Sequence, residues 1–181
     1  MNAEQAHLFR LNSIRTAKRF VLVVAFTFDL EDVTQALIEA KRRESGLDVR
    51  VLIDRDQSLS GPTANLRPRV LQLTSRAIPV RLYSRCRLHA KVLLSDAGQL
   101  WGSLNWTNAS LRNIERNAAT QLSQDLLDVE RRWFDDLWAV AKDFAGRESA
   151  DQMITPTKSS HQQQRHEQTP AVHRFSGEGG M

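Results

Sequence analysis

The chain has 181 residues, and its 25 Lys and Arg against 21 Asp and Glu give a formal net charge of +4 at pH 7. This length suits one domain with a sizeable core, and the mild basic excess is compatible with a polyanionic partner without requiring one. The single cysteine, Cys86, excludes an intrachain disulfide framework, and no Cys/His cluster has zinc-site spacing.

No targeting or membrane segment is predicted. Residues 1–19 are polar and lack the apolar core of a signal peptide. The longest apolar run, residues 20–26, is too short to span a bilayer. We therefore expect a cytoplasmic protein with no stable membrane anchor.

The first part of the chain alternates between helical and strand patterns. Apolar residues at helical spacing predict a helix over 3–18, and a continuous β-branched and aromatic run predicts a buried strand over 19–28. A second helix is expected from Asp29, as its N-cap, to about residue 44, followed by a strand over 48–54. A strand, a helix and a strand at this spacing predict a parallel pair with a right-handed crossover.

The pattern continues through the rest of the body. We expect a polar loop over 55–62, a helix over 66–76 and a strand over 79–83. Beyond residue 107 we expect a short helix over 108–114, a strand over 118–122 and a long amphipathic helix over 125–144. The apolar positions of this long helix are Leu126, Val129, Trp133, Leu137, Trp138 and Ala141. For the Trp133 and Trp138 stripe, core packing or a dimer interface is favoured over a ligand site.

These elements predict an α/β domain over residues 1–146, with a mixed, largely parallel sheet flanked by helices on both faces. From 147 to 181 the composition shifts to Gln, Ser, Thr, His, Pro and Gly with few apolar residues. Such a composition predicts a disordered tail, which is a possible site for partner proteins although nothing in it identifies one.

Residues 89–107 gather five chemically useful side chains in one predicted β-hairpin. His89 and Lys91 are two apart and would share a face of a strand. Asp96 precedes the turn, and the returning arm would bring Ser103 and Asn105 near the starting His.

These residue types indicate phosphate chemistry. A neutral imidazole such as that of His89 can attack phosphorus or transfer protons. Lys91 supplies positive charge, and the side chains of Ser103 and Asn105 can donate hydrogen bonds to non-bridging oxygens. The sequence shows no carboxylate cluster typical of a metal site, so Lys91 would do the electrostatic work that Mg²⁺ does elsewhere. The hairpin therefore predicts a phosphate-handling site with no metal and no cofactor.

The spacing of this motif resembles a known family. His89-Ala90-Lys91, four residues, Asp96 and then the run Gly-Ser-Leu-Asn at 102–105 closely resemble the HKD motif of the phospholipase D superfamily. The run to residue 107 looks most like the single-motif branch, which includes small bacterial endonucleases and the cardiolipin hydrolase/Zucchini group. The resemblance covers about residues 1–145. It implies a mixed sheet flanked by helices and a homodimer, because two motifs form one active site and no second His-x-Lys pair is present.

The resemblance also implies a role for each residue of the motif. His89 would be the nucleophile that forms a phosphohistidine, and the partner subunit's His89 would protonate the leaving group. Lys91 and Asn105 would hold phosphate oxygens, with Ser103 in support, and Asp96 would steady the hairpin and the charges of the site. No metal would be required.

The match departs from the family pattern after the hairpin. Relatives usually continue to a Glu followed by Asn. Without gaps, Arg116 falls at the Glu position and Asn117 matches, whereas a one-residue slip would restore a carboxylate as Glu115. Without that carboxylate, the orientation or the pKa of the site histidine would change.

Further side chains are candidates for binding substrate. Arg85 and Arg87 could line a phosphate groove, with solvated surface as the alternative. Trp106 could stack on a base, with packing beneath the hairpin favoured. The candidates for substrate binding are Arg85, Arg87, Trp106, Glu115 and Asn117.

Three functions compete at this point. The first is a homodimeric, metal-independent nuclease acting on DNA or RNA, which the basic body and the arginines beside His89 favour. The second is a phospholipid hydrolase using the same chemistry. The third is a nucleic-acid-binding subunit that has lost turnover, for which Arg116 is the only support.

Overall fold

A seven-stranded mixed sheet forms the centre of the protein, and the computed structural model describes residues 1–60 and 66–144. The strand order is β6-β5-β4-β1-β2-β3-β7. The strands are β1 (Phe20–Ala25), β2 (Asp48–Asp54), β3 (Val80–Tyr83), β4 (Val92–Ser95), β5 (Gly98–Gly102), β6 (Asn117–Thr120) and β7 (Lys142–Asp143).

The α/β class and the mixed sheet are confirmed, but the sheet is not largely parallel. The pairs β1–β2 and β2–β3 are parallel, as the strand–helix–strand pattern predicts. The four other pairs are antiparallel. For β4 and β5 the reason is local, because only residues 96 and 97 separate these strands and so short a connection allows only antiparallel pairing.

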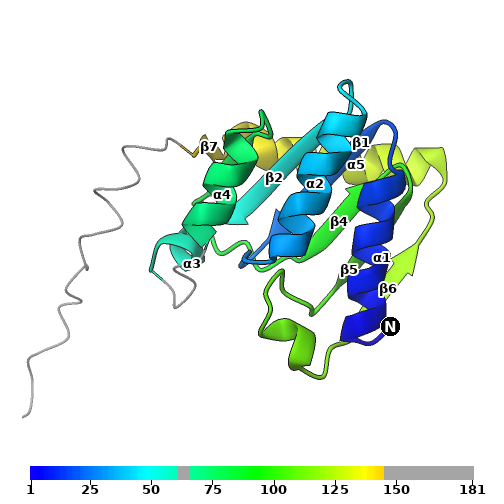
Figure 1. The fold of residues 1–181 in the computed structure, drawn as a ribbon, viewed down its shortest axis with the longest axis horizontal. Helices are drawn as coiled ribbons and strands as arrows, with labels where there is room; N and C mark the ends of the chain where they lie inside the picture. Colours follow the sequence, from blue (N-terminus) through cyan, green and yellow to red (C-terminus); the bar gives the residue numbers. More distant parts are fainter. Residues whose placement is uncertain (61–65, 145–181) are drawn as a thin grey trace, which may run out of the picture.

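Helices cover both faces of the sheet (Figure 1). On one face lie α1 (Ala3–Thr16), α2 (Glu31–Arg43) and α4 (Leu66–Thr74), and α5 (Gln124–Val140) lies on the other. Two short elements complete the fold, α3 (Arg55–Ser60) and the 3₁₀ turn η1 (Ser110–Arg112). None of the helices in the described part of the chain is both long and apolar enough to cross a membrane.

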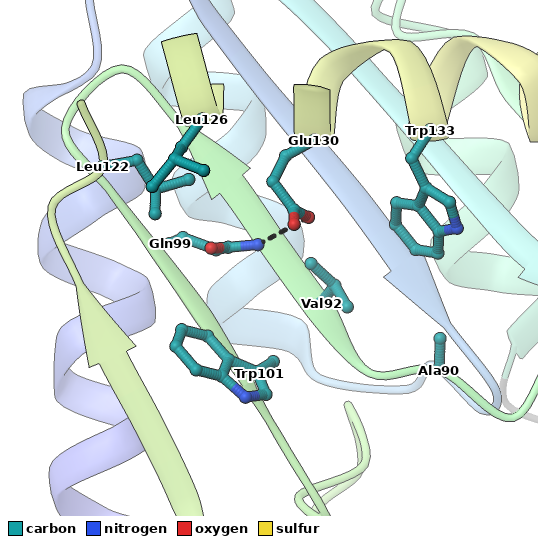
Figure 2. A pocket seen from close by; sticks show the side chains of 8 residues that line it. All are labelled: Ala90, Val92, Gln99, Trp101, Leu122, Leu126, Glu130 and Trp133. Atoms are coloured by element: carbon teal, nitrogen blue, oxygen red, sulfur yellow. Dashed lines mark hydrogen bonds between the residues drawn. The ribbon is translucent and has the colours of Figure 1, made fainter. Parts of the chain in front are cut away.

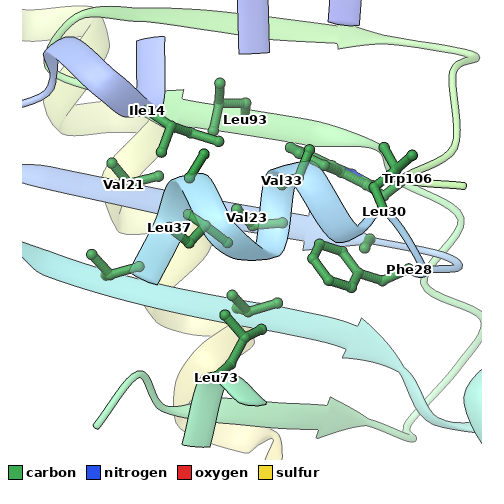
Figure 3. Close-up of a cluster of buried hydrophobic side chains, with 14 of the residues drawn as sticks. Ile14, Val21, Val23, Phe28, Leu30, Val33, Leu37, Leu73, Leu93 and Trp106 are labelled. Atoms are coloured by element: carbon green, nitrogen blue, oxygen red, sulfur yellow. The ribbon is translucent and has the colours of Figure 1, made fainter. Parts of the chain in front are cut away.

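The central strand β1 serves both layers of the core, because all six of its residues are buried. Val21 and Val23 pack into the cluster beneath α1 and α2, which Figure 3 shows, whereas Phe20 and Leu22 pack on the other side toward α5. The prediction of a strand buried on both faces is confirmed.

Several element boundaries differ from the predictions. Residues 55–60 form α3 rather than a loop, since the Asp54 carboxylate accepts a hydrogen bond from the Gln57 amide at 3.0 Å in the manner of an N-cap. Asp29 does not cap α2, because Leu30 holds that position and the Asp29 carboxylate instead accepts from the Asn108 amide at 2.9 Å. The last helix ends at Val140, and β7 follows it. The predicted tail, 147–181, lies outside the described residues.

The sequence indicates one apolar face for α5, and only part of that face packs against the core. Leu127 and Phe134 are the buried residues of this helix, with Leu137, Trp138 and Ala141 packed against the same cluster. Leu126, Val129 and Trp133 are 55%, 50% and 38% exposed. Of the two predicted alternatives for Trp133, core packing is therefore wrong.

Candidate active site

Four of the five predicted catalytic residues line one open pocket of about 470 Å³. They are His89, Lys91, Ser103 and Asn105, and Gly102 and Arg116 complete the lining. The ladders explain this convergence. Val92 pairs with Trp101 across the hairpin, so the residue before β4 meets the end of β5, and Gly102 pairs with Asn117, which brings the start of β6 alongside.

His89 does not belong to a strand, since β4 begins at Val92. The His89 side chain is exposed, and its ring stands edge-on to Phe26 with the ring centroids 4.6 Å apart. The Asp54 carboxylate, 3% exposed at the end of β2, accepts from the Leu88 amide at 2.7 Å. Asp54 and Phe26 therefore position His89, and the sequence analysis missed both. The sequence did hold a signal for Asp54, because an acidic residue at the end of a buried apolar strand is unusual.

Lys91 is buried at the base of the pocket, with only 6% of its surface exposed. Its Nζ donates to the His89 carbonyl oxygen at 2.7 Å and lies 4.8 Å from the centroid of the Phe26 ring. Burial lowers the pKa of Lys91, and the negative charge of Glu115 opposes this shift. A cation is thus held close to the backbone of the histidine.

Arg116 stands where relatives usually carry a Glu, and the contacts of Ser103 show how Glu115 supplies a carboxylate instead. The Ser103 hydroxyl donates to the Glu115 carboxylate and accepts from the Arg116 amide at 3.0 Å, and the Ser103 amide donates to the Arg116 carbonyl oxygen at 3.1 Å. The Glu115 carboxylate therefore reaches the site through Ser103, as the one-residue slip predicts. Arg116 adds a further cation to the lining of the pocket.

Asn105 presents an amide with unmet hydrogen-bonding capacity. Its Oδ1 is buried and has no partner among the described residues. The loop that carries it is fixed from below, because the Trp106 amide donates to the Thr27 carbonyl oxygen at 3.2 Å and the Asp29 amide to the Trp106 carbonyl oxygen at 2.7 Å. Asn105 lines the pocket on this fixed loop. The Nδ2 of its amide can donate to a bound ligand, whereas the buried Oδ1 can only accept a hydrogen bond.

Three predicted site residues have structural roles instead. Trp106 is fully buried, and its indole donates to the Val24 carbonyl oxygen at 3.0 Å, so base stacking is wrong and packing beneath the hairpin is confirmed. Asn117 is 6% exposed, and its Oδ1 accepts from the Leu104 amide at 3.2 Å, so it supports the loop rather than lining the pocket.

Asp96 lies at the opposite end of β4 from the pocket and does not line it. Its carboxylate accepts from the backbone amides of Lys18, Arg19 and Phe20 at 3.1 to 3.3 Å. The assignment of Asp96 as catalytic is therefore wrong, and its steadying role is correct, since it ties the hairpin turn to the start of β1.

Arg85 and Arg87 are exposed in the segment before His89 and do not line the pocket. The Arg87 guanidinium lies 5.8 Å from the centroid of the Phe26 ring, against which His89 stands. Arg87 is thus close to the surroundings of His89, whereas the structure shows no such link for Arg85.

Gly102 is required by a close approach between β5 and β6. A Cβ at this position would lie 2.3 Å from the Asn117 Oδ1 and 2.6 Å from the Arg116 carbonyl oxygen. Any side chain would push these strands apart at the pocket.

We expect Gly102→Ala to lower the free energy of unfolding by about 1–3 kcal/mol, the usual cost of overpacking. Urea denaturation of the purified variant measures this change. Gly46→Ala is the matched control, because a Cβ there meets nothing within 4 Å. Equal stability of the two variants would contradict the close approach.

Comparison with known proteins identifies the family. A family model described as "Cardiolipin synthase, PLD-like domain" matches residues 11–138. The chain belongs to this PLD-like family. No curated protein matches its sequence.

Several solved structures share the fold. Nuc from Salmonella typhimurium, a phospholipase D family member, is 27% identical with a TM-score of 0.68, and the match covers 76% of this chain and 90% of that one. NucT from Helicobacter pylori is 16% identical with a TM-score of 0.65, covering 78% of this chain and 92% of that one. Phosphatidylserine synthase from Haemophilus influenzae Rd KW20 is 16% identical with a TM-score of 0.68. The match covers 84% of this chain and 40% of that one. The last two comparisons show the fold alone.

Proposed function

We propose that this PLD-like protein is a metal-independent phosphodiesterase that cleaves DNA or RNA in an active site shared by two copies of the chain. One observation carries the proposal. The pocket brings together a nucleophile (His89), a buried cation (Lys91) and a side-chain amide whose nitrogen can donate hydrogen bonds (Asn105). These are the groups that transfer of a phosphoryl group requires.

The reaction proceeds in two displacements. In the first, an imidazole nitrogen of His89 forms a bond to phosphorus, the bond from phosphorus to the leaving oxygen breaks, and the partner subunit's His89 gives that oxygen a proton. In the second, water attacks phosphorus, gives its proton to the partner's His89, and the phosphorus–nitrogen bond to His89 breaks. Lys91 and Asn105 stabilise the charge on the non-bridging oxygens in both steps.

Nucleic acid is the substrate that the charges around the pocket support. Arg116 lines the pocket, and Arg87 lies near the Phe26 ring against which His89 stands. Guanidinium groups bind successive phosphates of a polyanionic strand. The similarity of the motif to single-motif endonucleases supports the same substrate.

The deciding experiment incubates the purified protein with single- and double-stranded DNA and RNA in excess EDTA. Cleavage that continues in EDTA supports the proposal. Binding without cleavage under all conditions would favour a nucleic-acid-binding subunit, and cleavage only after addition of a divalent metal would contradict the metal-independent mechanism.

A phospholipid substrate is the second candidate, and an apolar groove favours it. A groove of about 490 Å³ lies between β4, β5 and α5, and Ala90, which lies between His89 and Lys91 in the sequence, forms part of its wall. It is lined by Ala90, Val92, Gln99, Trp101, Leu122, Leu126, Glu130 and Trp133 (Figure 2). An acyl chain could occupy this groove while its phosphate lies in the pocket. Release of a headgroup from cardiolipin or phosphatidyl vesicles, without cleavage of nucleic acid, would select this function.

We favour a second copy of the chain as the occupant of the groove. Trp101, Leu126 and Trp133 are 42%, 55% and 38% exposed on one continuous surface, and exposed apolar clusters of this kind mark protein interfaces. Two residues of the groove, Ala90 and Trp101, are next in sequence to His89 and Gly102 of the pocket, where the mechanism requires another His89. A two-fold axis at this surface would therefore bring two copies of the pocket together.

The lowered pKa of Lys91 predicts an alkaline limit to activity. Phosphate binding needs protonated Lys91, so kcat/KM should fall as pH rises through a pKa below that of an exposed lysine. Because the charge of Glu115 raises this pKa, Glu115→Gln should move the alkaline limb to lower pH. Profiles of kcat/KM against pH for both proteins measure the shift.

Lys91→Arg provides the control for this profile. The ordinary pKa of arginine lies above that of lysine, so this variant should move the limb to higher pH. A limb that is unchanged in Lys91→Arg would show that another group causes it.

A further inference from the structure

Arg10 lies on α1, beneath the loop that carries Asn105, and the sequence analysis did not single it out. Its side chain is among the largest that are fully buried, with 1% of the residue exposed. Its Nη2 donates to the Leu104 carbonyl oxygen, and its Nη1 donates to the Asn105 carbonyl oxygen at 3.2 Å. The guanidinium also lies 4.1 Å from the centroid of the Trp106 ring. One side chain thus contacts three consecutive residues of the loop.

The charge of Arg10 is not neutralised locally. None of the ion pairs in the described part of the chain involves this residue, and its Nε has no partner there. Burial lowers the pKa of Arg10 to about 9, and the more distant charges of Glu115 and Asp32 oppose the shift. Arg10 therefore stays protonated at neutral pH. A buried unpaired cation is costly, and an apolar side chain could fill the same space more cheaply.

The contacts of Arg10 explain why such a cation is kept. A guanidinium is a planar fork of donors, and here two of its nitrogens hold the carbonyl oxygens of adjacent residues while its face stacks on the next one. This arrangement fixes the backbone on both sides of the Asn105 peptide. No other buried side chain is described that holds both carbonyl groups.

We infer that Arg10 is a positioning residue, which fixes the Leu104–Asn105 backbone so that the Asn105 amide points at the phosphate in the pocket. This inference rests on the proposed phosphodiesterase activity. It requires Arg10 to act through Asn105, without touching the substrate. The two residues should therefore not contribute independently to the reaction.

The test is a double-mutant cycle on the cleavage of single-stranded DNA or of bis(p-nitrophenyl) phosphate. Asn105→Ala removes a donor to the developing charge and should lower kcat by about 10²–10³-fold. Arg10→Met should lower kcat by about 10–10²-fold with little change in KM, since it misplaces this donor in the transition state. The double variant should be no slower than Asn105→Ala, which is the non-additivity expected of residues that act as a unit.

Two further variants separate positioning from charge and from folding. Arg15→Met removes a positive charge from the exposed side of the same helix and should leave kcat unchanged. Arg10→Lys keeps the buried charge but loses the fork, so it should restore part of the loss and no more. Full rescue by lysine would show that charge alone matters and would overturn the positioning role.

The remaining outcomes also decide the matter. A folded Arg10→Met with wild-type kcat overturns the inference, as does a double variant whose losses multiply. If both Arg10→Met and Arg10→Lys lose their circular dichroism signal, the residue is structural and the inference is wrong. Wild-type protein that cleaves neither substrate contradicts the proposed function itself, whereas an active wild type with an unaffected Arg10→Met contradicts only the role of Arg10.

Discussion

Replacing His89 by alanine is expected to reduce phosphodiester cleavage by on the order of 10⁴-fold or more, since a proton-transfer group alone contributes up to about that factor. In the proposed site this histidine acts twice, as the nucleophile of one copy and as the acid of the other. The exposed imidazole stands against Phe26, and among the described residues its ring takes part in no hydrogen bond, so its loss should leave the fold intact. Single-turnover cleavage of labelled DNA in EDTA measures the effect.

A matched control for this variant is His7→Ala. The His7 ring contacts the Asp32 carboxylate at 2.7 Å, and it lies outside the pocket. This variant should cleave as the wild type does. Rapid acid-free quenching of the wild-type reaction should also trap a phosphorylated histidine that is missing from His89→Ala. Cleavage by the His89→Ala variant at the wild-type rate would contradict the assigned mechanism.

The hairpin could be predicted from sequence because its contacts are local. The turn residues and the pairing of Val92 with Trp101 are close in the chain, so spacing alone indicates which side chains meet. The detail within the pocket was harder to predict. His89 is exposed and Lys91 is buried, because the lysine amine turns back to the His89 carbonyl oxygen rather than following the alternation of a strand.

The roles of Trp106 and Asp96 depend on residues that lie far away in the chain. The Trp106 indole bonds to the carbonyl oxygen of Val24 at the end of β1, and the Asp96 carboxylate binds amides at the start of the same strand. Both residues lie within or beside the motif, so spacing suggests a part in the chemistry. Only the packing of the hairpin against β1 assigns them to the fold.

The long helix shows a different limit of sequence reasoning. Its apolar residues form two adjacent stripes, and a helical period cannot say which of them meets the sheet. Leu127 and Phe134 pack against the sheet, so Leu126 and Trp133 lie at the surface. Of the apolar positions that the sequence indicates, Leu126, Val129 and Trp133 are therefore available for a partner.

That surface supports the second large effect that we expect. Leu126→Glu should convert the protein to monomers and abolish cleavage at nanomolar concentration. Leu126 is 55% exposed and lines the groove, so in the proposed dimer a glutamate there would bury an unpaired charge. A cost of several kcal/mol would raise the dimer dissociation constant by about 10²–10³-fold or more. Light scattering and cleavage assays over a range of protein concentrations measure both quantities.

Leu8→Glu is the matched control, because Leu8 is 59% exposed on α1, which covers the opposite face of the sheet. It should remain dimeric and active. The activity of Leu126→Glu should return at high protein concentration, since mass action restores the dimer. A wild-type protein that is monomeric at micromolar concentration, yet cleaves nucleic acid, would contradict the shared site and leave the groove free for substrate.

Mixed dimers then distinguish a shared site from mere pairing. If each reaction uses the His89 of both copies, a dimer of one wild-type and one His89→Ala subunit is inactive. Adding a roughly tenfold excess of His89→Ala should therefore reduce wild-type cleavage by about tenfold, because most wild-type subunits exchange into inactive pairs. The same excess of the doubly substituted His89→Ala/Leu126→Glu protein should have no effect, since it cannot pair. Inhibition by both proteins would point to competition for substrate, and inhibition by neither would show that each copy works alone.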